Sequence, residues 1–263
     1  MGYTEGDTIR KLSKEINSPE FIYKSDVVNY TGKTVGTKLP YTEVCSLYMC
    51  ENMKSIFGEN GKKIKIINRE QGYFVEGHDG IIKEFTNRGE EILAKAVYLK
   101  DIPKLGFVFD YQIPLKQSNK DAKVGKIDMV SINEEGIISL IELKAAKSNE
   151  TLLRCALEIY TYSKQINKEI FINDIKNSYI NKFKEKNDLR SYFNKFINDD
   201  NKLEKIQSVV LIFEGSTPAN MVDPNTYPKT NELVKKLGVK VYVYPADITF
   251  TAFADFEEPS KII

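Results

Sequence analysis

Residues 126–144 have the sequence KIDMVSINEEGIISLIELK, in which two apolar segments flank a short polar turn. Branched and other apolar residues fill both segments, which is typical of strands in a sheet. Between the segments, Asn133 is followed by two glutamates and Gly136. A three-residue loop that ends in a left-handed glycine is a common hairpin turn. We therefore predict an antiparallel hairpin with strands over 126–132 and 137–144.

The length of the turn decides which side chains face each other across this hairpin. With a three-residue loop, Asp128 lies directly opposite Glu142, and Lys126 lies opposite Lys144. A loop of two or four residues would shift the register by one position and turn Asp128 to the other face of the sheet. Glu142 and Lys144 are two residues apart on one strand, so they share a face. This register brings two carboxylates and an ammonium group together.

Two carboxylates that face each other in an apolar strand repel. At about 5 Å and an effective dielectric constant of about 20, the repulsion costs roughly 3 kcal/mol. Protonation of one carboxyl, neutralisation by Lys144, or a divalent cation between the two acids would offset this cost. Carboxylate oxygens suit Mg²⁺ or Mn²⁺, and a lysine beside such a metal can orient or deprotonate a water for attack on a phosphodiester. The alternative is a buried Asp-Glu-Lys cluster whose charges only neutralise one another.

The two strands resemble a known signature. The segments KIDMV (126–130) and IELKA (141–145) are similar to the motif of the PD-(D/E)XK nuclease superfamily, with Ile127 in place of the motif's proline. That replacement is common in the family. The predicted order of a helix, three strands, a helix and a strand also resembles the family's restriction-endonuclease-like core. The likeness covers roughly residues 86–215.

The resemblance implies a role for each residue of the motif. Asp128 and Glu142 would bind Mg²⁺ (or Mn²⁺), the backbone carbonyl of Leu143 would complete the metal's coordination, and Lys144 would be the catalytic lysine. The implied activity is hydrolysis of DNA phosphodiester bonds by a deoxyribonuclease of the endonuclease class. Two alternatives stay open: a nuclease directed at RNA, and a non-catalytic module that binds nucleic acid or protein on the same fold.

Members of the family often carry a further glutamate on the helix before the first strand of the core. Here a helix predicted over about 86–97 offers Glu90 and Glu91 as candidate metal ligands. Glu90 borders the apolar stripe through Leu93 and Val97, whereas Glu91 points more toward solvent, so Glu90 is favoured. For both residues, a carboxylate that simply stabilises the first turn of the helix is an equal explanation.

A long helix predicted over 149–167 carries a polar stripe at helical spacing, formed by Thr151, Arg154, Glu158, Tyr162 and Gln165. Glu158 and Tyr162 resemble the Gln-x-x-x-Tyr motif of the RecB-like branch, with glutamate replacing glutamine. By this resemblance Glu158 would lie near the metal or pair with Arg154, and Arg154 and Tyr162 would contact substrate or support the site. A solvated face with an Arg–Glu pair is the alternative. Gln112 could reach the site from the neighbouring strand, although a polar residue on an edge strand is the better interpretation.

The remaining patterns extend the fold on both sides of the hairpin. Strands are predicted over 107–115, 208–213 and 239–244, a helix over 229–237, and a mildly basic helical insertion near 168–205. The resulting fold class is α/β, with a mixed central β-sheet flanked by helices.

The first 80 residues are predicted to form an α+β extension packed on the core. It would contain helices over 4–16 and 40–57 and strands within 63–76, so that residues 81–263 make up the nuclease-like core. His78 is expected in a loop.

Composition limits the class of protein. Lys and Arg number 38 and Asp and Glu 37 in 263 residues, a net charge of +1 that argues mildly against a protein that coats nucleic acid. No apolar run reaches the roughly 18 residues that span a bilayer. Three cysteines and one histidine exclude a disulfide framework and a histidine-rich metal site. We expect a reduced cytoplasmic protein with a nucleic-acid partner, most simply DNA, no membrane partner, and a homodimer as an open alternative.

Overall fold

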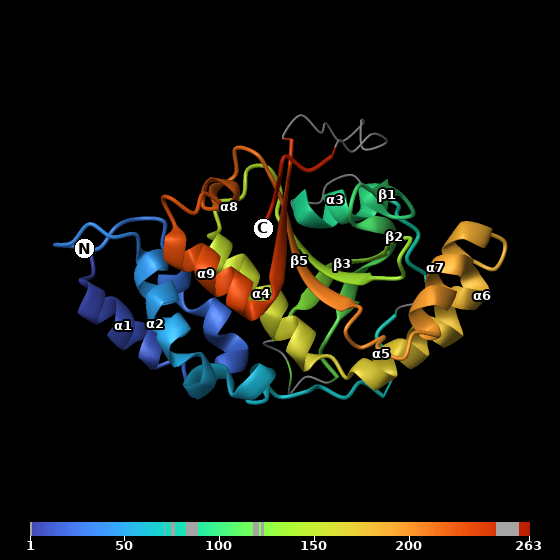
Figure 1. Ribbon diagram of the computed structural model, residues 1–263, viewed down its shortest axis with the longest axis horizontal. Coiled ribbons are helices and arrows are strands. Elements are labelled where there is room, and N and C mark those ends of the chain that lie inside the picture. The colour runs from blue at the N-terminus through green and yellow to red at the C-terminus, as the bar shows by residue number, and fades with distance from the viewer. Residues whose placement is uncertain are drawn as a thin grey trace.

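The computed structural model describes residues 2–70, 72–74, 77–82, 89–117, 121, 124–245 and 258–263 (Figure 1). Its strands form one mixed sheet in the order β1-β2-β3-β4-β5-β6-β7. Pairing is antiparallel from β1 to β4, parallel from β4 to β6, and antiparallel between β6 and β7. The strands are β1 (Asp101–Ile102), β2 (Gly106–Pro114), β3 (Lys126–Ile132), β4 (Ile138–Leu143), β5 (Ile206–Phe213), β6 (Val239–Tyr244) and β7 (Lys261–Ile262).

Helices flank this sheet, so the predicted α/β class with a mixed central sheet is confirmed. The α-helices are α1 (Glu5–Ser13), α2 (Tyr41–Phe57), α3 (Gly89–Val97), α4 (Leu152–Gln165), α5 (Lys168–Asp174), α6 (Ile180–Lys182), α7 (Asn187–Ile197), α8 (Thr217–Asn220) and α9 (Pro228–Leu237). Short 3₁₀-helices are η1 (Pro19–Lys24), η2 (Asp26–Asn29) and η3 (Glu59–Gly61), and η5 (Ile175–Tyr179) is a short π-helix. Within the described residues, no helix is both long enough and apolar enough to cross a lipid bilayer.

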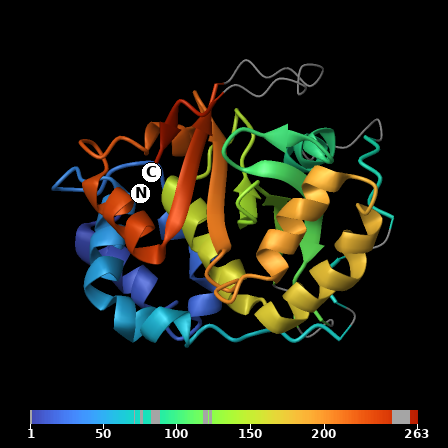
Figure 2. The ribbon, with the colours of Figure 1, turned by 45° about the vertical axis from the view of Figure 1, so that its right-hand side comes forward.

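The two faces of the sheet bury separate apolar clusters. On one face, Leu140 of β4 and Val210 of β5 belong to the cluster that contains the apolar side of α4. On the other face, Ile141 and Leu143 belong to the cluster that contains α3. Figure 2 shows α4 lying across the sheet, with the helices of the 168–205 insertion beyond its end. The alternation along β4 therefore turns Glu142, which shares a face with Leu140, toward α4.

The predicted hairpin is confirmed, and its register is confirmed for the four pairs from Met129–Ile141 to Ile132–Ile138. The predicted facing pairs Asp128–Glu142 and Lys126–Lys144 lie beyond this paired stretch. Val130 pairs with Leu140 and Ile132 pairs with Ile138, as a three-residue loop requires. The Asn133 N–H donates to the Ile137 carbonyl at 3.1 Å, and Gly136 has φ +74°, which a glycine adopts without strain.

The prediction of strands within 63–76 is wrong for the part that the structure describes, 63–70 and 72–74. This stretch contains one isolated bridge, between Ile67 and Ile166. Its backbone groups bond to helix ends: the Ile67 N–H donates to the Gln165 carbonyl at 2.8 Å, and the Tyr73 N–H donates to Asp174 at 2.6 Å. With those groups engaged, no strand ladder forms. Residues 86–88, the predicted start of the helix before the core, lie outside the described residues.

The N-terminal segment packs directly on the rest of the molecule. Helix α2 lies against α9 and η1 lies against α4. Leu12, Ile22 and Met49 belong to the same apolar cluster as the face of the sheet under α4. The predicted insertion is helical, and its rings Tyr179 and Phe193 are buried against Phe109 of β2. These aromatic side chains are therefore part of the core and unavailable for base stacking.

Candidate active site

A polar row crosses three neighbouring strands at one end of the hairpin. Gln112 on β2 and Asp128 on β3 lie opposite each other, between the pairs Tyr111–Met129 and Ile113–Ile127. The Gln112 side-chain amide donates to Asp128 Oδ1 at 3.2 Å. The other oxygen, Asp128 Oδ2, accepts the Leu143 N–H at 2.9 Å. Asp128 is thus held by one side chain and by one backbone group of β4. Gln112 has φ +52°, a left-handed conformation that is unusual for a non-glycine residue.

Lys144 follows β4 and is surrounded by carboxylates. Its Nζ lies 2.7 Å from Glu142 Oε1, 3.0 Å from Glu150 Oε2 and 3.7 Å from Glu90 Oε1. The backbone N–H of Lys144 donates to the Leu211 carbonyl of β5 at 2.9 Å, and this hydrogen bond positions the backbone from which the side chain extends. Glu142 and Lys144 are only 3% and 5% exposed. The predicted Glu–Lys juxtaposition on one face of the strand is present.

Burial shifts the protonation of these acids. It raises the pKa of Asp128 to about 7, although the nearby Lys144 charge works against the shift. Burial, with Glu158 and Asp128 close by, also raises the pKa of Glu142 well above its usual value. Desolvation disfavours the ammonium form of Lys144, but the surrounding acidic groups, Glu142 first among them, together outweigh it and raise the pKa of the lysine. Both acids are therefore shifted toward their neutral form, whereas Lys144 is held as an ammonium group.

Helix α4 brings part of its polar stripe to this cluster. The Tyr162 hydroxyl donates to Glu158 Oε1 at 2.7 Å, and Arg154 Nε lies 4.0 Å from Glu158 Oε2. The buried Tyr162 hydroxyl also lies 3.3 Å from the Tyr23 hydroxyl. Tyr162 therefore holds Glu158 in place through a hydrogen bond made inside the core. The hydroxyl of Thr151 caps the helix by accepting the Arg154 N–H at 3.1 Å.

Glu150 is a member of the cluster that the sequence prediction missed. Its carboxylate bridges Lys144 at 3.0 Å and Arg154 Nη2 at 3.3 Å. The i,i+4 spacing between Glu150 and Arg154 was the available signal, because an acid four residues before an arginine at a helix start pairs readily with it.

The structure separates the two glutamates of α3. Glu90 lies near Lys144, and burial raises its pKa. Glu91 instead pairs with Lys95 at 2.8 Å on its own helix. Both line a pocket of about 550 Å³, together with Gly89, Gln112, Asp128, Ala145, Lys147 and Ser148. Asp128 and Gln112 reach this pocket, whereas Glu142 and Lys144 are not among the residues that line it.

The side chains around Lys144 offer oxygen donors that can be compared with those a divalent cation requires. Among the described residues, no three His, Cys, Asp or Glu side chains converge as a formed metal site. The Lys144 ammonium group stands among the carboxylates. The donor set nevertheless suits a hard cation: the acids are in excess, and Glu158 Oε2 is buried without a hydrogen-bond partner. Their oxygen atoms are of the kind that Mg²⁺ and Mn²⁺ bind. Leu143, predicted to offer its carbonyl, contributes its N–H to Asp128.

A further buried acid, Asp110, lies two residues before Gln112 on β2. Asp110 Oδ1 lies 2.5 Å from His78 Nδ1, and Asp110 also accepts the Tyr179 hydroxyl. The His78 ring stacks on Tyr111 with centroids 4.3 Å apart. These contacts join residues far apart in the sequence, so no local pattern could have indicated them. They tie the loop of His78 and the helical insertion to β2.

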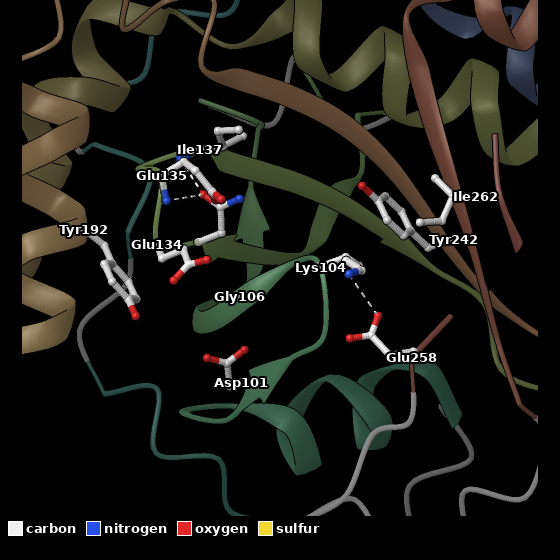
Figure 3. Close-up of a pocket in the computed structure, with 11 residues that line it drawn as sticks. Asp101, Lys104, Gly106, Glu134, Glu135, Ile137, Tyr192, Tyr242, Glu258 and Ile262 are labelled. Atoms are coloured by element: carbon white, nitrogen blue, oxygen red, sulfur yellow. Dashed lines mark hydrogen bonds and ion pairs between the residues drawn. The ribbon is translucent and has the colours of Figure 1, made fainter. Parts of the chain in front are cut away.

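A different pocket, of about 670 Å³, lies at the turn end of the hairpin (Figure 3). Carboxylates gather on its rim, and Lys104 pairs with Glu258 at 3.3 Å. Burial, with Glu134 close by, raises the pKa of Asp101. The hairpin separates this pocket from Lys144, so it is not part of the candidate active site.

The candidate active site thus consists of Asp128, Glu142 and Lys144, with Gln112, Glu90, Glu150 and Glu158 around them. Its likeness to a nuclease motif rests on these residues and on the order of the elements that carry them. No family model matches the chain, and searches of curated proteins and of solved structures likewise return no match.

Proposed function

We propose that this protein is a metal-dependent nuclease that hydrolyses DNA phosphodiester bonds on a PD-(D/E)XK-like core. The observation that carries the proposal is the meeting of the motif's acid and lysine side chains at one end of β3 and β4. Glu142 lies 2.7 Å from Lys144, and Asp128 is anchored to the N–H of the intervening Leu143. The order α3, β2–β4, α4, β5 adds support.

Each residue has a task in this proposal. Asp128 and Glu142 would hold the cation, with Glu90 or Glu158 as a further oxygen ligand. The bound cation would supply positive charge to the phosphate and lower the pKa of a water. Lys144, whose raised pKa favours the ammonium form, would donate hydrogen bonds that orient the attacking water or a phosphate oxygen. Arg154, held by Glu150, would contact the substrate at the edge of the site.

Cleavage assays with a matched variant test the proposal. Wild type, Lys144→Ala and the exposed-lysine control Lys240→Ala are incubated with plasmid, linear and single-stranded DNA and with RNA, in Mg²⁺, Mn²⁺ or EDTA. We expect metal-dependent cutting of DNA that falls by roughly 100-fold or more in Lys144→Ala and stays unchanged in Lys240→Ala. Lys144→Gln keeps a polar side chain without the charge and serves where Lys144→Ala does not fold. Cutting that persists in folded Lys144 variants, or in EDTA, contradicts the proposal.

One observation favours a second function, a non-catalytic nucleic-acid-binding module on the same fold. Glu142 and Lys144 are nearly inaccessible, and their charges already neutralise each other. A protein of this kind would bind DNA in the same assay without cutting it in any metal. Preferential cutting of RNA would assign the third function, an RNA-directed nuclease.

A further inference from the structure

A third pocket, of about 830 Å³, lies at the far end of α4 from Arg154, between the loop after η3 and the start of α5. We call it the lysine pocket, because four lysines line it: Lys62, Lys65, Lys164 and Lys168. Lys62 and Lys65 are exposed, and Lys164 and Lys168 are half-buried. The four lysines come from two chain segments about 100 residues apart.

The charges of these lysines are not neutralised within the described part of the chain. No ion pair there joins any of the four to a carboxylate; Lys168 Nζ donates to the Leu203 carbonyl at 3.4 Å, and Lys164 Nζ lies 5.3 Å from the centre of the Tyr160 ring. Glu169 is the one acid among the lining residues. Because the whole chain carries a net charge of only +1, this local excess of positive charge is a property of the site.

The arrangement is unfavourable without an anion. Burial lowers the pKa of Lys164, and the charge of Lys168 lowers it further. Burial likewise lowers the pKa of Lys168. A bound anion would relieve all of these effects.

Apolar side chains between the lysines point to the kind of anion. Ile64 and Ile166 line the lysine pocket, and at its mouth Ile66 and Leu203 are 54% and 46% exposed. A nucleic-acid strand presents phosphates beside apolar sugar and base surfaces, and therefore matches both features. Lys164 also lies ten residues beyond Arg154 on α4, about 15 Å along the helix axis, a distance that a few nucleotides span.

We propose that the lysine pocket binds the phosphodiester backbone of a nucleic acid, away from the site of cleavage. The choice of a nucleic acid as the polyanion rests on the proposed function. The lysines would neutralise consecutive phosphates, and the apolar walls would contact the sugars and bases between them.

Binding without cleavage tests this inference. Fluorescence anisotropy in EDTA measures the Kd of labelled single-stranded DNA, duplex DNA and single-stranded RNA over a series of salt concentrations. The variants are Lys62→Ala/Lys65→Ala and Lys164→Gln/Lys168→Gln, and the matched control is Lys235→Ala/Lys240→Ala, two exposed lysines that line none of these pockets. Circular dichroism shows whether each variant is folded.

We expect each pocket variant to weaken binding of at least one of the three probes by roughly tenfold at low salt. For a single strand, the slope of log K against log[salt] is negative. Its magnitude should decrease by about 1.4 in each double variant, which is about 0.7 for each phosphate that a lysine no longer neutralises. The control should change Kd by less than about twofold, because its lysines bind no phosphate. Equal Kd values in pocket and control variants, or no binding of any probe by the wild type, overturn the inference.

The two proposals fail in different ways. Absence of cleavage, together with binding that depends on the lysine pocket, contradicts the nuclease and leaves the binding site. Cleavage that depends on Lys144, with binding that ignores the four lysines, contradicts the lysine pocket and leaves the nuclease.

Discussion

Asp128 is a carboxyl group whose surroundings favour its neutral form. Its pKa rises to about 7 through burial, against about 3.9 in an unfolded chain. Between these values the folded protein holds a proton that the unfolded chain releases, so stability falls as pH rises from about 4 to 7. The raised pKa of Glu142 acts in the same direction. A divalent cation would oppose this loss by stabilising the charged carboxylates.

Asp128→Asn should therefore stabilise the metal-free protein at pH 8, by on the order of 2 kcal/mol, and the gain should vanish toward pH 4. The asparagine oxygen can still accept the Leu143 N–H, and its amide can donate to a flipped Gln112. Urea unfolding in EDTA at several pH values measures the difference. Asp200→Asn, at an exposed position, is the control. A difference that does not change with pH would contradict this account of Asp128.

Lys144 and Glu142 depend on each other for their charge. Lys144→Met should destabilise the protein by roughly 3–5 kcal/mol, because it leaves Glu142 buried without its nearest cation. Adding Glu142→Gln should restore a large part of that loss. A double-mutant cycle from urea unfolding measures the coupling. Additive effects of the two substitutions would show that the pair does not act as a unit.

At the scale of elements, the hairpin turn sets the register of β3 and β4. Gly136 and Gly215 share a left-handed φ, +74° and +80°. A Cβ on Gly136 would lie 2.8 Å from the Phe196 N of α7, whereas a Cβ on Gly215 meets no atom within 4 Å. A substitution at Gly215 therefore measures the cost of the left-handed backbone alone. The same substitution at Gly136 adds a steric clash with α7.

Gly215→Ala should cost about 1 kcal/mol, from the left-handed conformation alone. Gly136→Ala should cost measurably more, because α7 must move away from the turn. Thermal and urea unfolding of the two variants give the comparison. Equal losses would mean that the contact between the turn and α7 adds nothing to stability.

At the scale of the whole molecule, α2 supplies hydrogen-bond acceptors to the first turn of α9, which lies far along the chain. Glu43 is buried, and its carboxylate accepts the Lys229 N–H at 2.9 Å and the Thr230 N–H and hydroxyl, both at 2.8 Å. These are groups at the start of α9, which are otherwise without partners in the helix. The N-terminal segment is therefore joined to the core by polar as well as apolar contacts.

Glu43→Ala should lower the free energy of unfolding by roughly 2 kcal/mol, because it leaves buried donors unpaired. Glu51→Ala, at an exposed site on the same helix, should change it by less than about 0.5 kcal/mol. Urea unfolding followed by circular dichroism measures both. If the first 80 residues are integral to the core, the unfolding of Glu43→Ala remains a single transition. A separate early transition would indicate an independent N-terminal unit.

The sequence by itself determined the hairpin and the placement of Glu142 beside Lys144 on one face of its second strand. The reason is local: a three-residue turn that ends in Gly136 sets the register, and strand alternation then places every side chain. The same local patterns located the strands of the sheet and the long helix α4. Two-residue strands such as β1 carry too few residues to show a pattern.

Only the tertiary structure decided which groups surround that hairpin. Glu43 at the start of α9, Asp110 beside His78, and the four lysines of the lysine pocket all depend on segments far apart in the chain. The stretch 63–76 alternates like a strand, and this alternation does not reveal that helix ends engage its backbone. Contacts of this kind follow from how whole elements pack, and a periodic sequence pattern carries no information about a distant partner.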